Sequence, residues 1–185
     1  MAEFPAKVST VTSSQPHTTG QSFTSRFLSV DLVFIRTIPA ILMIFEIALG
    51  LLVWALIAST HYYKIPAFGW VMFVSVVLWI LTIILFLLYF LGVNRKLAIV
   101  PWTITTLAFN ISAAILYITA FLANAASITP YFRAGSLDFN NLAAAAFFAC
   151  LVMIAYCASS FFGFMAWRGE GSNAATSQAD GSRPA

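Results

Sequence analysis

Four long apolar stretches constrain most strongly what this chain can fold into. They cover residues 37–60, 67–91, 97–126 and 142–167, and each exceeds the roughly 20 residues that an α-helix needs to cross a bilayer core of about 30 Å. The second stretch has no charged residue, whereas a helix at the surface of a soluble protein needs a polar face. The composition agrees, with 61% hydrophobic and 8% charged residues. The sequence therefore predicts an all-α integral membrane protein, folded as a four-helix transmembrane bundle.

The two ends of the chain are polar and are predicted to lie outside the membrane. Residues 1–36 form an N-terminal tail whose start is rich in Ser, Thr and Pro and does not resemble a cleavable signal peptide. We therefore expect the first span to direct insertion. Residues 168–185 form a C-terminal tail that is too polar and too rich in small residues to fold alone.

A short amphipathic pattern precedes the first span. Phe23, Phe27, Val30 and Phe34 share one stripe of a helix over residues 22–34. This pattern predicts an interfacial helix that lies in the membrane plane. A partly ordered tail that runs into the membrane fits the same residues equally well.

The basic residues predict how the bundle is oriented. Seven of them fall in the two tails and in the loop between the second and third stretches, and two fall in the other loops: Lys7, Arg26, Arg36, Arg95, Lys96, Arg168 and Arg183, against Lys64 and Arg133. The positive-inside rule then places both termini in the cytoplasm. The net charge of +3 is explained by this bias, and we expect no nucleic-acid partner.

The connections between spans differ in size. The loop THYYKIP is short, and the segment 127–141 is the only outer connection large enough to offer an exposed surface. Asn140 or Asn141 is predicted to cap the fourth helix. Pro39 and Pro101 lie near helix starts, where a missing N–H removes no internal hydrogen bond.

One acidic residue lies deep inside the first span. Counting from Arg36 at about 1.5 Å per residue, Glu46 is roughly 15 Å deep, near the middle of the membrane. Thr82, Asn110 and Tyr156 lie at similar depth on the other three helices. We expect these four residues to form one polar layer inside the bundle.

The cost of inserting a carboxyl group supports this layer. An acid at the bilayer centre costs about 2.5 to 3.5 kcal/mol on insertion scales, so Glu46 should face other helices. Three roles remain open for it: a structural hydrogen bond between helices, the handling of protons or ions, and contact with a lipid headgroup.

Small residues predict where helices approach each other closely. Gly50 lies one turn beyond Glu46 on the same face. The fourth helix carries a stripe of small residues that suits contact within the bundle or between copies of it: Ala144, Ala155, Ser159 and Gly163.

Nothing in the sequence indicates catalysis or a bound cofactor. His17 and His61 fall on opposite sides of the predicted membrane, so they cannot form a metal pair. The sequence contains no phosphate-binding loop and no nucleophile beside a base. We expect no enzyme activity, no catalytic residue, no cofactor and no metal.

Longer motifs resemble a known family. The stretches IFEIALGLLVWALIAS and GWVMFVSV are similar to the first two spans of the MARVEL-domain family, in particular its myelin and lymphocyte protein branch. The resemblance covers essentially the whole chain and is weakest at residues 11–30 and 127–141. Glu46, Gly50 and Trp54 fall on the family's first-span pattern, and Gly69 and Trp70 fall on its second.

The resemblance implies a non-enzymatic tetraspan organiser with cytoplasmic termini. Such proteins associate with membrane lipids in cholesterol- and sphingolipid-rich domains, self-associate, and support vesicle and apical membrane traffic and myelin formation. The implied locations are the apical and myelin plasma membrane and vesicles derived from endosomes and the Golgi. We expect the tails to recruit cytoplasmic sorting adaptors. The alternative is an oligomeric ion channel whose path is lined by the Glu46 layer.

Overall fold

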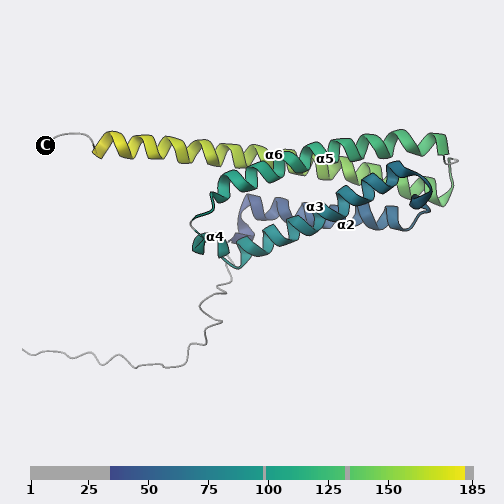
Figure 1. The fold of residues 1–185 in the computed structure, drawn as a ribbon, viewed down its shortest axis with the longest axis horizontal. Helices are drawn as coiled ribbons and strands as arrows, with labels where there is room; N and C mark the ends of the chain where they lie inside the picture. Colours follow the sequence, from purple (N-terminus) through teal and green to yellow (C-terminus); the bar gives the residue numbers. More distant parts are fainter. Residues whose placement is uncertain (1–33, 98, 132–133, 182–185) are drawn as a thin grey trace, which may run out of the picture.

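The structure is a computed structural model that describes residues 34–97, 99–131 and 134–181 (Figure 1). Within these residues four helices are long and apolar enough to cross a membrane: α2 Ile38–Ala58, α3 Pro66–Phe90, α5 Trp102–Tyr131 and α6 Leu137–Gly181. Three short helices connect or precede them: η1 Phe34–Arg36, η2 Tyr62–Lys64 and α4 Val93–Lys96. The predicted all-α, four-helix membrane fold is confirmed. The stripe expected at 22–34 lies almost wholly outside the described residues.

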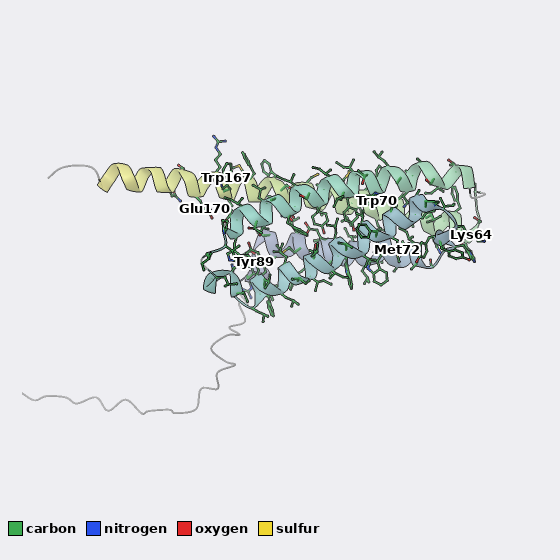
Figure 2. The ribbon with its side chains drawn as sticks, viewed as in Figure 1. Lys64, Trp70, Met72, Tyr89, Trp167 and Glu170 are labelled. Carbon is green, nitrogen blue, oxygen red and sulfur yellow. The ribbon has the colours of Figure 1, made fainter. Side chains whose placement is uncertain are left out.

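The four long helices lie side by side and form a ring. α2 packs on α3 and α6, and α5 packs on the same two helices. Figure 1 places the start of α2, the short α4 and the projecting part of α6 at one end of the bundle. We call this the basic end, because Arg36, Arg95 and Arg168 belong to it. The opposite end, where Figure 2 labels Lys64, is called the far end.

Local sequence explains where the first helices begin and end. Thr37 caps α2, because its Oγ1 accepts a hydrogen bond from the Ala40 amide at 3.4 Å. Pro39 lies in the first turn of α2, and Pro66 begins α3. After α3, Gly92 adopts a positive φ of 63°, which lets the chain turn into α4.

The third span begins later than predicted. The expected helix was 97–126, but residues 93–96 form the separate helix α4, and α5 begins at Trp102. Pro101 explains the break, because the ring of a proline disfavours the helical conformation of the residue before it. The Pro101 carbonyl then accepts the first hydrogen bond of α5, from the Thr105 amide at 3.0 Å.

The connection between α5 and α6 is shorter than predicted. The segment 127–141 was expected to be a large loop, but α5 continues to Tyr131 and α6 begins at Leu137, before the predicted residue 142. Extending an existing helix adds a hydrogen bond for each residue that is fixed. The residues at the two ends of this segment therefore continue α5 and begin α6.

The residue that caps α6 also differs from the prediction. Ser136 accepts a hydrogen bond at its Oγ from the Phe139 amide at 3.2 Å, so Ser136 is the cap rather than Asn140 or Asn141. Asn141 instead donates from its side chain to the Ser59 hydroxyl at 3.0 Å. His61 lies 3.1 Å from Asp138. Both contacts tie the first loop to the start of α6.

α6 does not stop at residue 167. It continues to Gly181, and Figure 1 shows this part projecting beyond the other helices. The Thr103 hydroxyl donates to Glu170 at 2.8 Å and fixes the first projecting turn against α5. Residues 168–181 were expected not to fold alone. They extend a helix that is already formed, which avoids the cost of nucleation.

The outer surface of the bundle is strongly apolar. All four long helices carry large hydrophobic side chains that are at least half exposed, among them Phe45, Phe73, Ile115, Phe147 and Phe161. A soluble protein would bury these side chains. Their exposure fits a bundle that is surrounded by acyl chains.

Replacing the α6 cap tests the observed helix start. We expect Ser136→Ala to lower the free energy of unfolding by about 1 kcal/mol, because the Phe139 amide loses its acceptor. The measurement is unfolding of the purified protein in mixed micelles by a denaturing detergent. Asn140→Ala is the matched control and should change little. A larger effect at Asn140 would show that the cap lies where the sequence placed it.

Candidate functional site

Glu46 is enclosed by protein at the centre of the bundle. Only 2% of its surface is exposed, although it lies midway along α2. Ser159 of α6 donates a hydrogen bond from Oγ to Glu46 Oε1 at 2.5 Å. This bond joins the first span to the last, 113 residues later in the chain. The other carboxyl oxygen, Oε2, has no hydrogen-bond partner among the described residues.

A second polar pair joins α3 to α6. Thr82 and Tyr156 are both buried, and their hydroxyl oxygens are 2.7 Å apart. Thr82 donates its own proton to the Leu78 carbonyl at 2.8 Å, so Tyr156 must be the donor of this pair. The Tyr156 ring also packs against Tyr117 of α5, with 5.6 Å between ring centroids.

Asn110 is buried but is not bonded to Glu46. It is 4% exposed, and its Oδ1 lacks a hydrogen-bond partner in the part of the chain that the structure describes. All four residues of the predicted layer are therefore buried. They form two separate bonded contacts, Glu46 with Ser159 and Thr82 with Tyr156, while Asn110 lines a cavity.

Gly50 lies where α2 contacts α3 and α5. A Cβ atom added there would be 3.4 Å from Trp79 Cδ1 and 3.6 Å from the Tyr117 hydroxyl. Trp79 is held in place because its Nε1 donates to the Ile47 carbonyl at 3.0 Å. A Cβ at this distance is in ordinary van der Waals contact, so a side chain larger than that of alanine would push against this fixed indole ring.

The small residues of α6 make contacts within this one chain. Ala155 and Ser159 are buried, and a Cβ at Gly163 would be 3.5 Å from Leu107 of α5. Ala144 is half-buried. A neighbouring row of buried residues on the same helix was not predicted from the sequence. It repeats at spacings of three and four: Leu142, Ala145, Ala149 and Val152. That spacing was the available signal.

A cavity of about 410 Å³ opens at the basic end. The long helices, η1 and α4 all contribute to its wall. Half of the lining residues carry a polar side-chain group: Thr37, Tyr89, Asn94, Thr103, Thr106, Asn110 and Ser159. Figure 2 labels Tyr89 at this end, where its hydroxyl lies 2.8 Å from that of Thr106. The sequence did not predict the cavity, because its lining combines residues from all parts of the chain.

The family model described as MARVEL, membrane-associating domain, matches residues 34–162. The chain belongs to the MARVEL family. The family resemblance seen in the sequence is thus confirmed, and the match begins at η1 and ends in α6, just beyond Ser159.

Plasmolipins are among the MARVEL proteins similar to this chain, and they match it over nearly their full length. Plasmolipin of Mus musculus is 54% identical over 181 residues, which is 98% of this chain and 98% of the mouse protein. Plasmolipin of Danio rerio is 50% identical over 96% of this chain and 98% of its own length. CKLF-like MARVEL transmembrane domain-containing protein 8 of Homo sapiens is 45% identical over 82% of this chain and 90% of its own. No solved structure matches this MARVEL chain.

A double-mutant cycle tests the bond between α2 and α6. We expect Glu46→Ala and Ser159→Ala to be coupled by about 0.5 to 1.5 kcal/mol in the free energy of unfolding, because each removes the other's partner. The control cycle pairs Glu46→Ala with Thr60→Ala, whose hydroxyl bonds within its own turn. A coupling no larger than that of the control would show that the hydrogen bond between Glu46 and Ser159 does not stabilise the bundle.

Two glycine substitutions test the close contact on α2. We expect Gly50→Leu to destabilise the protein by about 1 to 3 kcal/mol, because the side chain must displace Trp79. Gly69→Leu should change stability by less than about 0.5 kcal/mol, since a Cβ at Gly69 meets no described atom within 4 Å. Unfolding in mixed micelles measures both. Equal effects would show that α2 and α3 do not approach each other as observed.

Proposed function

We propose that this MARVEL protein is a non-enzymatic organiser of thick, ordered membrane. In this proposal it associates with cholesterol- and sphingolipid-rich domains, self-associates, and supports vesicle and apical traffic and the formation of myelin membrane. Both termini face the cytoplasm, and the protein resides in the apical or myelin plasma membrane and in vesicles derived from endosomes and the Golgi.

The hydrophobic length of α3 is the observation that carries this proposal. α3 has 25 residues with no charged side chain, which at about 1.5 Å per residue is roughly 37 Å. The core of the sterol-rich plasma membrane is about 32 to 33 Å thick, and that of the endoplasmic reticulum about 27 Å. α3 therefore fits the thicker core at a tilt of about 30°, whereas the thinner core would require about 44°, beyond the usual range of roughly 0 to 40°. α2 has 21 residues, fewer than the predicted 24, so the length argument does not extend to it.

The outer surface of the bundle supports the proposed self-association. Because Ala155, Ser159 and Gly163 are used in contacts within the chain, copies would meet through the exposed apolar faces instead. Bulky groups such as Phe147 and Phe161 offer these contacts.

The projecting part of α6 supports the proposed recruitment of adaptors. Residues 168–173 are exposed and extend past the bundle. A preformed helix loses less conformational entropy on binding than a flexible tail. An adaptor would therefore find a rigid surface close to the membrane.

The contacts of the polar layer favour an organiser over the alternative of an ion channel. A conducting path needs polar groups that are free to solvate an ion. Three of the four residues of the layer are instead bonded inside a single chain: Glu46 accepts from Ser159 at Oε1, and Tyr156 donates to Thr82. Glu46 Oε2 and Asn110 Oδ1 have no partner among the described residues, but both are buried from any probe the size of water. These bonds suit helix packing better than ion passage.

Shortening α3 tests the role of length. Deleting residues 83–86 removes about 6 Å but rotates the following residues by little more than one turn, so the buried face is largely kept. We expect the fraction of protein in the ordered phase of phase-separated vesicles to fall several-fold, because a shorter span fits the thinner phase.

The matched control keeps the length of α3 and changes its surface. Ile80, Ile84 and Leu87 are exposed, and replacing all three by Ala should leave the helix as long as before. If the deletion variant partitions as the unmodified protein does, length is not the cause of sorting. If the alanine variant alone leaves the ordered phase, side-chain bulk is the cause.

A further inference from the structure

Two polar contacts at the far end join the first loop to the start of α6. His61 Nδ1 lies 3.1 Å from Asp138 Oδ2, and Asn141 donates from Nδ2 to the Ser59 hydroxyl at 3.0 Å. Both contacts lie apart from the buried polar layer. They differ in one respect, because an imidazole changes its charge in the physiological pH range, whereas an amide and a hydroxyl do not.

The backbone on each side of the histidine contact is held in place. The His61 carbonyl accepts from the Lys64 amide at 3.3 Å, which fixes His61 at the start of η2. Asp138 lies in the first turn of α6, whose start is capped by Ser136. A negative side chain is favoured in the first turn of a helix, because the unpaired amides there carry partial positive charge. Asp138 is therefore a negatively charged partner at a fixed position.

Protonation of the imidazole ring strengthens this contact. A neutral ring carries one N–H, so only one of its two tautomers can donate from Nδ1 to Asp138. A protonated ring always carries that hydrogen, and a hydrogen bond between opposite charges is roughly twice as strong as a neutral one. The His61 side chain is 62% exposed, so the surrounding water supplies the proton.

The pH range of this change follows from the two kinds of side chain. Histidine ordinarily gains its charge as the pH falls from about 8 to about 5, a range in which aspartate ordinarily remains ionised. The charged contact between His61 and Asp138 therefore contributes stability at the acidic end of this range. That contribution is lost as the pH rises.

Few other charged or titratable groups lie near the contact. Tyr62, Tyr63 and Lys64 belong to η2 on the same loop, and the rings of His61 and Tyr63 are 6.2 Å apart between centroids. Lys64, labelled at this end in Figure 2, is exposed, so water and salt screen its charge. Within the described residues α3 and α5 carry no charged side chain, and α6 carries none between Asp138 and the basic end. Asp138 is thus the carboxylate that responds to the ring.

We propose that His61 and Asp138 form an acid-sensitive clasp, in which protonation of His61 holds the first loop more firmly against the start of α6. Glu46 and Ser159 join α2 to α6 at the middle of the bundle, so the clasp acts on the same two helices at the far end. The proposal rests on the proposed function only for the compartment: with both termini in the cytoplasm, the clasp faces the acidic lumen of vesicles. The response to pH does not depend on that orientation.

A double-mutant cycle at two pH values tests the clasp. The full-length protein, His61→Gln, Asp138→Asn and the double variant are unfolded in mixed micelles at about pH 8 and at about pH 5.5. We expect the coupling, expressed as a ratio of unfolding equilibrium constants, to rise about threefold at the lower pH, as is usual for an exposed ion pair. Equal coupling at the two pH values overturns the proposal.

The neighbouring contact supplies a matched control. Asn141→Ala and Ser59→Ala form a second cycle between the same two segments, and neither side chain titrates in this range. The coupling in this cycle should be the same at both pH values. If both cycles change by the same factor, the whole far end responds to pH and His61 is not the sensor, which also overturns the proposal.

A measurement on the folded protein avoids unfolding altogether. The chain has two histidines, so His17→Gln leaves His61 as the only imidazole signal in an NMR sample made with isotope-labelled histidine. Asp138→Asn should weaken proton binding to His61 about threefold, which is the same coupling seen from the proton. An unchanged titration would show that no clasp exists. In sealed vesicles, a titration that follows the pH on the side of the tails would contradict the proposed orientation and leave the clasp supported.

Discussion

A carboxyl group in the middle of a membrane span has to be enclosed by protein, and the arrangement of α2 and α6 follows from the way Glu46 is enclosed. Lipid offers no hydrogen bond, so an acid that faced acyl chains would retain the full cost of leaving water. Ser159 supplies a donor to Glu46, and the surrounding helices exclude lipid from the group. This bond fixes the rotational orientation of the first span of this MARVEL chain relative to the last.

Close packing around this contact depends on small residues. Gly50 lets Trp79 of α3 approach α2, and the alanines of α6 let the neighbouring helices approach that helix. Between spans the hydrophobic effect contributes little, since lipid is as apolar as the helix surfaces. Van der Waals contact and a few buried hydrogen bonds must then stabilise the bundle, and both need backbones that approach closely. The cavity at the basic end is the place where this packing is incomplete.

The sequence predicted the parts of the fold that depend on local physics. Four spans follow from apolar length, and a buried position for Glu46 follows from the cost of a carboxyl group in lipid. Ser159 was singled out as a small packing residue, but its hydrogen bond to Glu46 was not predicted, because the rotation of α6 depends on contacts with two other helices. The cap at Ser136 was missed since several polar residues compete at that helix start. The cavity was not predicted because Asn94 and Asn110 line the same space only after the chain has folded.

The account can be tested most directly by the reaction of Glu46 with a hydrophobic carbodiimide, which modifies protonated carboxyl groups that face lipid. Because the bundle encloses it, Glu46 should be protected in the folded protein and should react after unfolding in a denaturing detergent. The positive control is Glu46→Gln combined with Ile44→Glu, which moves the acid two residues along α2 to a position that is 42% exposed. Rapid modification of Glu46 in the folded bundle, at the rate of this control, would contradict the enclosure on which the packing depends.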